Sequence, residues 1–305
     1  MMRALFISLS KSPALRRFAL RNRLAQKAAR RFVAGLTLDE AVPAILELNA
    51  KGIRVTMDFL GESVSTKDEA LEAANEAIRI LETIQARGIQ GNVSVKLTQL
   101  GLELGQDFCR DNVARIVEKA KALGNFVRID MEGTDATDRT LGIFYAMLER
   151  FGPAHVGIVV QSYLYRTERD VAEILRRGAR IRLCKGAYRE PATLAFPKKK
   201  DVNTNYFKLT RMMLDSGIYH GIATHDETMI RNTRAFAEQK GIDRKTFEFQ
   251  MLYGIRRDLQ EQLVRDGYNM RVYVPYGNQW YPYYMRRLAE RPANVFFIMK
   301  NYFRK

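Results

Sequence analysis

The sequence predicts an α/β fold, a distorted (βα)8 TIM-like barrel with an N-terminal helical arm. Eight strand-like segments alternate with helical segments after residue 50, and short strand–helix–strand connections indicate parallel strands with right-handed crossovers. Nearly every strand also ends in charged or hydrogen-bonding residues, at the rim where barrel enzymes place their active sites. An open doubly wound sheet is the alternative, but no GxGxxG fingerprint follows any strand.

The strands are expected at Arg54–Leu60, Asn92–Leu97, Phe126–Met131, His155–Gln161, Arg180–Lys185, Tyr219–His225, Thr246–Leu252 and Met270–Tyr276. Apolar residues spaced by three and four predict helices at Leu38–Asn49, Lys67–Arg87, Cys109–Leu123, Asp135–Arg150, Glu168–Arg177, Asn203–Leu214, Asp226–Lys240, Arg256–Arg265 and near Pro282–Arg291. Eight such units close naturally into one barrel.

Length and composition fit one globular barrel. The chain has 305 residues, of which 47% are hydrophobic and 28% charged, and α/β barrels commonly occupy ~250 residues as one unit. We expect residues 1–50 to form the arm and 51–305 the barrel. Two cysteines are too few for a disulfide framework, the histidines lack a metal-binding spacing, and no apolar run reaches transmembrane length.

The net charge of +16 predicts an acidic partner, which can be nucleic acid, an anionic membrane surface or an anionic substrate. Much of the charge lies at the N-terminus, because residues 1–38 are basic and contain no acidic residue. The segment is typical of a basic surface helix or a transit peptide. Its helical spacing continues into the next helix, which favours a retained arm over a cleaved segment.

Two adjacent arginines, Arg286 and Arg287, are expected near the start of the last helix, where the helix dipole favours anions. Guanidinium groups bind carboxylates or phosphates in two places. The two arginines and Lys96 can therefore converge on one small carboxylate. A solvated basic face paired with Glu290 is the alternative interpretation.

The end of the fifth strand suits a phosphorylated cofactor, because Arg182 and Lys185 are followed by the small residues Gly186 and Ala187. Thr224 and His225 open a later helix and can add donors to the same phosphates. No nucleophile motif or metal triad is present. A rim rich in cations and poor in acid–base pairs indicates cofactor chemistry.

Taken together, the strand-end motifs resemble the FAD-dependent proline dehydrogenases, specifically the monofunctional bacterial type. The matching stretches are Asp58-FLGE, Ser94-VKLT, Ile129-DME, Val160-Q, Arg182-LCKGAYRE, Ala223-THD, Glu248-FQMLYG and Tyr273-VPYG followed by YYMRRLAERPAN. They run in the family's order from about residue 50 to the end. At Arg189 the sequence departs from the tryptophan that some members carry.

The resemblance implies non-covalent FAD at the strand ends and oxidation of L-proline to Δ1-pyrroline-5-carboxylate, the first step of proline catabolism to glutamate. It implies that electrons pass to a membrane quinone, with the enzyme cytoplasmic and peripheral on the membrane face. A separate pyrroline-5-carboxylate dehydrogenase would consume the product, because this chain lacks the aldehyde dehydrogenase domain of bifunctional members.

The resemblance also implies roles for individual residues. The substrate carboxylate would be gripped by Lys96, Arg286 and Arg287, and the pyrrolidine ring would pack on Leu252 and Tyr273. Asp130 would orient the pocket, and Arg182 would bond the flavin near its reactive edge. The remaining flavin contacts would be Met131, Gln161, Lys185, Gly186, Ala187, Tyr188, Thr224, His225 and Glu290. Glu62 would be a gate that pairs with Arg286.

Two other classes remain open at this point. A basic barrel that binds a polyanion rests on the net charge alone and lacks any nucleic-acid motif; we expect no nucleic-acid partner. A lyase would use Lys96 or Lys185 as a Schiff base. A flavoprotein is yellow as purified, whereas both rivals are colourless.

Overall fold

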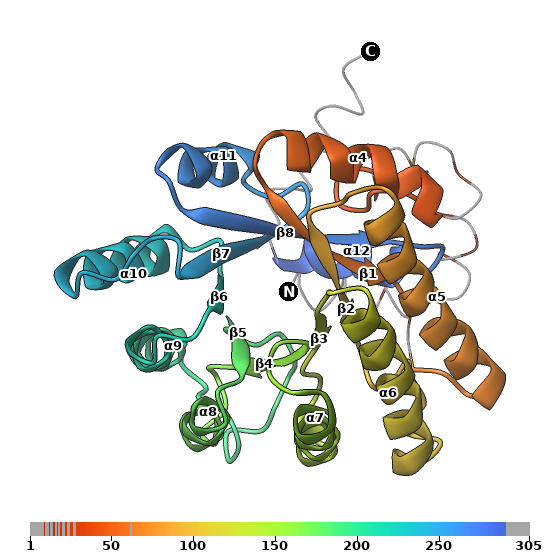
Figure 1. Ribbon diagram of the computed structural model, residues 1–305, viewed down its shortest axis with the longest axis horizontal. Coiled ribbons are helices and arrows are strands. Elements are labelled where there is room, and N and C mark those ends of the chain that lie inside the picture. Colours follow the sequence, from red (N-terminus) through yellow and green to blue (C-terminus); the bar gives the residue numbers. More distant parts are fainter. Residues whose placement is uncertain are drawn as a thin grey trace.

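The eight strands close into one parallel barrel in chain order, β1 to β8, in the computed structural model (Figure 1). The structure describes residues 9, 12, 15, 17, 19, 22, 25, 26, 29–61 and 63–290, without the side chains of 289 and 290. The strands are β1 (Arg54–Phe59), β2 (Gly91–Val95), β3 (Val127–Ile129), β4 (Val156–Gln161), β5 (Arg180–Cys184), β6 (His220–Ala223), β7 (Phe247–Leu252) and β8 (Asn269–Tyr276).

Helices follow the strands and surround the barrel, as Figure 1 shows for α5 to α10. They are α4 (Leu38–Ala50), α5 (Lys67–Ala86), α6 (Gln106–Ala122), α7 (Thr137–Phe151), α8 (Thr167–Arg176), α9 (Lys199–Asp215), α10 (Glu227–Gln239), α11 (Arg257–Arg265) and α12 (Trp280–Glu290). The predicted (βα)8 class is confirmed. Each strand ends within two residues of its predicted bounds, while α9 begins four residues before its predicted start.

The strands present apolar side chains to the helices and polar side chains to the barrel interior. Val93 and Val95 of β2, for example, are buried in one continuous core with apolar residues of α5 and α6. Each fully buried aliphatic side chain stabilises the fold by about 1.5–3 kcal/mol relative to exposure. Local signals agree with this packing: Thr66 and Glu69 form a reciprocal capping box at the start of α5.

The barrel departs from a regular (βα)8 arrangement at its seam. Helix α4, which precedes β1, contacts both β1 and β8. Helix α12, which follows β8, instead buries Trp280 and Tyr284 against Phe32 of the arm and Leu60 beyond β1. Because Leu60 follows the C-terminal end of β1, α12 lies toward the rim that carries the strand ends. The predicted distortion therefore consists of α4 on the barrel wall and α12 at the rim.

The predicted position of Arg287 near the start of its helix is wrong. Helix α12 begins at Trp280, two residues before Pro282, so Pro282 is its third residue and still occupies the first turn, where no intrahelical N–H bond is lost. Arg287 belongs to the last turn of Trp280–Glu290, where the helix dipole favours cations. The dipole therefore gives no reason to expect an anion beside the two arginines.

Candidate active site

Four predicted site residues meet inside the barrel near the C-terminal ends of the strands. Arg182 of β5 donates from Nη1 to Oδ1 of Asp130 at 2.8 Å, and the Tyr273 hydroxyl of β8 donates to Oδ2 of Asp130 at 2.8 Å. Lys96 Nζ lies 3.2 Å from the Tyr273 hydroxyl and 3.8 Å from Oδ2 of Asp130. Asp130 is therefore shared by two cations and a phenol.

The Arg182 guanidinium donates hydrogen bonds to residues on or directly after four other strands. Besides Asp130, its guanidinium donates to Gln250 Oε1 at 2.6 Å, Ser94 Oγ at 3.3 Å and Thr56 Oγ1 at 3.4 Å. Such bonds reach strands that are not neighbours of β5 only by crossing the barrel interior. Arg182 is only 4% exposed, so this polar network replaces the solvation that burial removes.

Lys96 bridges two carboxylates. Its Nζ forms an ion pair with Oδ1 of buried Asp58 at 2.7 Å, in addition to the longer contact with Asp130. Burial lowers the pKa of Lys96, but the charges of Asp58 and Asp130 outweigh burial and raise it above its ordinary value. Burial raises the pKa of Asp58 against the opposing charge of Lys96. Lys96 is thus held protonated, which disfavours its use as a Schiff-base nucleophile.

Tyr273 lies between the two cations of the network. The Lys96 ammonium is 5.9 Å and the Arg182 guanidinium 5.3 Å from its ring centroid. Burial, together with Asp130 and Asp58, raises the pKa of Tyr273 well above its ordinary value. The phenol therefore stays a neutral donor, and its ring gives the site a flat apolar face.

Gln161, at the end of β4, offers an acceptor to a ligand. Its Nε2 donates to the carbonyl oxygens of Met131 and Glu132 at 2.9 and 3.1 Å. Its Oε1 is buried and has no hydrogen-bond partner in the part of the chain that the structure describes. A buried acceptor of this kind is costly unless a donor reaches it. An N–H of a flavin ring is such a donor, so this residue fits the implied cofactor.

The proposed phosphate region surrounds the start of α10. Lys185 pairs with Asp226 at 2.7 Å, and Asp226 also caps α10 by accepting from the Thr228 amide. Thr224 Oγ1 accepts from the Asp226 amide, and His225 Nε2 accepts from the Leu252 amide at 2.9 Å. The structure therefore joins Lys185 to the Thr224–His225 segment through Asp226.

Gly186 combines a positive φ with close packing against a neighbouring side chain. Its φ is +110°, and a Cβ atom there would lie 2.3 Å from the Tyr163 ring. Only glycine fits both constraints. The exposed Ala187 and Tyr188 follow directly, so the loop carries its backbone close to the barrel and then out to solvent.

Helix α12 carries the two arginines that were predicted to bind the substrate carboxylate, Arg286 and Arg287. Arg286 is exposed, and the half-buried Arg287 lies over the Tyr283 ring at 5.1 Å. Tyr188 is 47% exposed, and the partial burial of its side chain raises its pKa to about 12. Lys96 and Arg286 oppose that rise, so Tyr188 lies within electrostatic range of both cations. Convergence of the arginines with Lys96 on one carboxylate stays a prediction. Glu62 and the Glu290 side chain lie outside the described residues.

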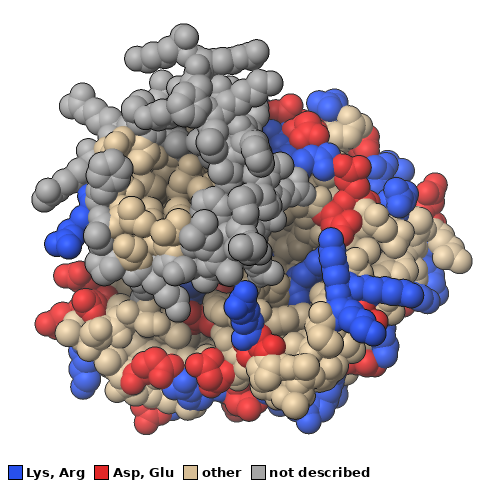
Figure 2. Space-filling view, turned by 180° about the vertical axis from the view of Figure 1, so that it is seen from behind, with Lys and Arg blue, Asp and Glu red and all other residues tan. Residues whose placement is uncertain are grey.

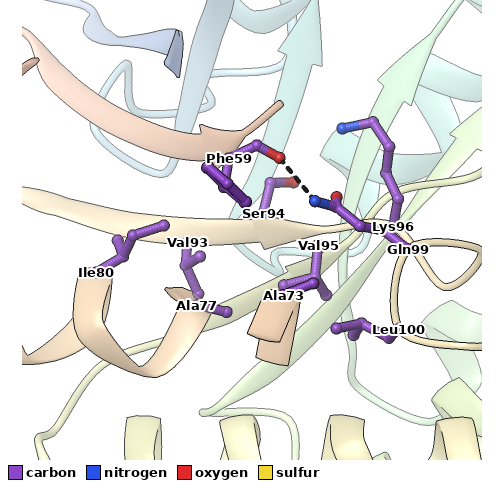
Figure 3. Close-up of a pocket in the computed structure, with 10 residues that line it drawn as sticks. All are labelled: Phe59, Ala73, Ala77, Ile80, Val93, Ser94, Val95, Lys96, Gln99 and Leu100. Carbon is purple, nitrogen blue, oxygen red and sulfur yellow. Dashed lines mark hydrogen bonds between the residues drawn. The ribbon is translucent and has the colours of Figure 1, made fainter. Parts of the chain in front are cut away.

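A small cavity lies behind the site, between β2 and α5 (Figure 3). Apolar side chains of both elements line most of it, and Gln99 closes one side by donating to the Phe59 carbonyl at 3.3 Å. Figure 3 shows the Lys96 amino group pointing away from this cavity. The cavity is a gap in the barrel wall and not the substrate site.

Several residues of the network were not predicted as site residues. They are Thr56, Asp58, Ser94, Glu248 and Gln250, all buried. A signal was present: in β7, FEFQML, polar residues alternate with apolar ones, whereas strands of parallel sheets usually read as continuous apolar runs. Alternation in a parallel barrel indicates a polar interior.

The face of the molecule drawn in Figure 2 gives little support to a polyanion-binding barrel. Figure 2 shows Lys and Arg side chains interspersed with Asp and Glu over the described residues of that face. The described residues also contain no group of three or more His, Cys, Asp or Glu that could hold a metal ion. None of the helices described is long and apolar enough to span a membrane.

The fold and the site define a (βα)8-barrel enzyme with a buried polar network beneath its strand ends. The model of the family "Proline dehydrogenase" matches residues 41–300. The chain is 43% identical to proline dehydrogenase 2 of Bacillus subtilis strain 168, over 99% of each chain. It is 45% identical to proline dehydrogenase of Deinococcus radiodurans, over 89% of each.

Among solved structures, proline utilization A (PutA) from Bdellovibrio bacteriovorus, inactivated by N-propargylglycine, superposes with a TM-score of 0.82 and 26% identity. The match covers 87% of this chain and 33% of that one, so the chain spans about a third of that protein's length. The chain belongs to the proline dehydrogenase family, in its monofunctional bacterial form. The family resemblance read from the strand-end motifs is thereby confirmed.

Proposed function

We propose that the protein oxidises L-proline to Δ1-pyrroline-5-carboxylate with a non-covalent FAD at the C-terminal rim of the barrel. The observation that supports this most directly is the Lys96–Asp130–Arg182–Tyr273 network. It offers fixed cations, a neutral phenol and a flat ring where strand ends meet. These groups suit an amino-acid substrate whose carboxylate must be held while its ring faces a cofactor.

The flavin would be held by residues of neighbouring strands. Arg182 and Gln161 would bond its ring, with Met131 beside it. The ribityl and phosphate portion would lie against Lys185, Gly186, Ala187, Thr224 and His225, with Tyr188 and Glu290 nearby. When bound, FAD supplies the acceptor for the hydride that leaves the proline carbon next to nitrogen.

The side chains of this protein would bind and orient the substrate. Lys96, already held protonated by its carboxylates, would grip the proline carboxylate together with Arg286 and Arg287. Tyr273 and Leu252 would pack on the pyrrolidine ring, and Glu62 would pair with Arg286 to close the site. Fixing the carboxylate at three cations fixes the ring carbon relative to the cofactor.

The same cations would favour the neutral substrate amine, which must form before hydride leaves, because nearby positive charge disfavours the protonated amine. Asp130 is poorly suited to accept that proton, since Arg182 and Ser94 occupy Oδ1 and Tyr273 occupies Oδ2. We assign Asp130 the role of orienting Arg182 and Tyr273. Proton acceptance then falls to water or to an exposed group.

We further propose that electrons pass to a membrane quinone and that the enzyme sits peripherally on the cytoplasmic membrane face. A separate pyrroline-5-carboxylate dehydrogenase would consume the product. The basic arm, residues 1–50, would contact anionic lipid; exposed Arg17 supports this, although Arg30 pairs with Glu40 at 3.4 Å.

The membrane step can be tested with vesicles of equal parts phosphatidylcholine and phosphatidylglycerol. Neutralising Arg16, Arg17, Arg30 and Arg31 is expected to release the protein from these vesicles. A matched variant neutralises four exposed basic residues away from the arm, Arg87, Lys121, Arg231 and Lys245. Unchanged sedimentation of the arm variant, or equal release of both, would count against a role for the arm.

The central test is an absorbance spectrum of the purified protein, before and after L-proline is added without oxygen. A flavin band that bleaches with proline supports cofactor, substrate and direction of electron flow together. A flavin band indifferent to proline would move the substrate to another amine or imino acid. A colourless protein that FAD cannot reconstitute would refute the proposal.

A further inference from the structure

Two residues of β7, Glu248 and Gln250, lie beneath the site and have no role in the function proposed above. Both point into the barrel, and they are 2% and 4% exposed. The two side chains are bonded to each other, since Gln250 Nε2 donates to Glu248 Oε1 at 2.6 Å. Gln250 also bonds to Arg182, which links this pair to the proposed flavin site.

Both carboxylate oxygens of Glu248 accept hydrogen bonds from neighbouring side chains. Oε1 accepts from Arg271 Nε at 2.7 Å as well as from Gln250, and Oε2 accepts from the Tyr219 hydroxyl at 2.9 Å. Burial raises the pKa of Glu248, but the charge and hydrogen bond of Arg271 outweigh burial and lower it. Glu248 is therefore an ionised carboxylate that demands donors from its neighbours.

The need of Glu248 for a donor determines the orientation of the Gln250 amide. An ionised carboxylate accepts only from the amide NH2 group, so the carbonyl oxygen of Gln250 must face the other way. On that side lies Arg182 Nε, 2.6 Å from Gln250 Oε1. The reversed amide would place NH2 against a guanidinium and oxygen against a carboxylate, and both contacts would be repulsive.

The barrel makes room for this arrangement through Gly221 of β6. A Cβ atom on Gly221 would lie 2.4 Å from Gln250 Nε2 and 2.9 Å from its amide carbon. The φ of Gly221 is not in the left-handed region, so the reason for glycine here is space and not backbone conformation. The side chain of Gln250 thus occupies the position that a β6 side chain would fill.

The guanidinium of Arg182 is left with one donor for a ligand. Gln250, Asp130, Ser94 and Thr56 supply four acceptors within the described part of the chain, and a guanidinium has five N–H groups. With Nε and Nη1 engaged by Gln250 and Asp130 at 2.6 and 2.8 Å, the plane of the group is set. The remaining N–H then has a defined direction.

We propose that Glu248 and Gln250 are positioning residues: Glu248 orients the Gln250 amide, and Gln250 fixes the guanidinium plane of Arg182 against the flavin. This inference rests on the proposed function, because it needs a flavin at the rim. A guanidinium in a fixed position stabilises the negative charge that hydride brings to the flavin. Loss of Gln250 should therefore make the flavin harder to reduce.

The test compares wild type with Gln250→Leu, which removes both bonds at similar volume. Hydrogen bonds to charged groups contribute roughly 1.5–3 kcal/mol, so kcat is expected to fall about tenfold or more, with a smaller change in KM for proline. The flavin midpoint potential, measured by dye equilibration, is expected to become more negative. Asn112→Leu is the matched control, because it removes a buried amide on α6 that bonds to the Leu100 carbonyl.

Gln250→Glu tests the orientation without an empty cavity. When protonated, the new carboxyl donates to Glu248 and presents its carbonyl oxygen to Arg182, as glutamine does. When ionised, it faces Glu248 with like charge. The flavin potential and kcat of this variant should approach wild type at low pH and depart from it as pH rises, beyond any drift in wild type.

These outcomes distinguish failure of the proposed function from failure of the positioning role of Gln250. Wild type without a proline-reducible flavin refutes the proposed function itself. With a reducible flavin in wild type, an unchanged potential and kcat in Gln250→Leu overturn the positioning role. So does an equal shift in Asn112→Leu, or a Gln250→Glu variant without the added pH dependence.

Discussion

The Tyr273 hydroxyl donates to Oδ2 of Asp130 at 2.8 Å, joining β8 to the residue that follows β3 across the barrel interior. Strands β3 and β8 are not neighbours, because β1 and β2 lie between them in the closed sheet. The bond therefore crosses the interior of the closed barrel, and the interior is polar at this level. It also fixes both the phenol and the carboxylate before any substrate enters.

Tyr273→Phe is expected to lower kcat/KM for proline about tenfold or more. The change removes the donor to Asp130 and the contact with Lys96, and a hydrogen bond to a charged group contributes roughly 1.5–3 kcal/mol. Steady-state assays with a soluble dye as acceptor measure the effect. Tyr276→Phe removes a hydroxyl that bonds to Glu76 on α5 and should leave kcat/KM near wild type. Equal activities in the two variants would contradict the role of Tyr273.

Gly186→Ala should reduce both stability and flavin retention. Alanine at φ +110° costs roughly 1–3 kcal/mol, and its Cβ would also meet the Tyr163 ring. Gly178→Ala is the matched control, since Gly178 has φ +70° with open space around its Cβ position. Urea unfolding and bound flavin per chain are the measurements. If both variants lose the same stability and neither loses flavin, the close packing on Tyr163 does not matter.

Phe32→Ala is expected to raise KM for proline and to destabilise the protein. Phe32 is buried against Tyr284 and Trp280, and we expect its loss to loosen α12, which carries Arg286 and Arg287. Phe144→Ala on α7 empties a similarly buried site on the barrel wall, and each change should cost about 3–5 kcal/mol. Only the first should raise KM; a similar KM in both variants would mean that the arm does not position α12.

Stability should fall as pH drops below about 6.5, because of His220. Burial, with a contribution from Arg128, lowers the pKa of His220 from 6.5 to about 3. Between these values the unfolded chain binds a proton that the folded chain refuses, so stability falls with pH by up to about 1.4 kcal/mol per pH unit.

His220→Asn checks the assignment, since its Oδ1 can replace the Nδ1 acceptor that binds the Ile181 amide. Urea unfolding between pH 4 and pH 6.5, roughly the window that the two pKa values bound, should show a shallower pH dependence than wild type. A slope equal to that of wild type would assign the titration to another group.

More of the fold than of the site could be predicted from the sequence. Strand and helix order followed from apolar periodicity, and the motifs at the strand ends identified the family. The pairing of Lys96 with Asp58 did not follow, since Asp58 lies on a neighbouring strand and nothing local to either residue pairs them. The placement of Arg287 near the start of its helix was wrong because the helix spans Trp280–Glu290, and helix boundaries are the least certain part of a periodic pattern.

The sequence by itself determined the barrel class, the order of its elements and the residue types at the rim, because periodicity and motif spacing are properties of the chain. Only the tertiary structure decided that α4 covers the seam of the barrel and that α12 packs on the arm. It alone showed that Glu248 bonds to Gln250 and that Gln250 bonds to Arg182. Such contacts join residues tens of positions apart, and they exist only after closure of the barrel removes these groups from water and leaves them to satisfy one another.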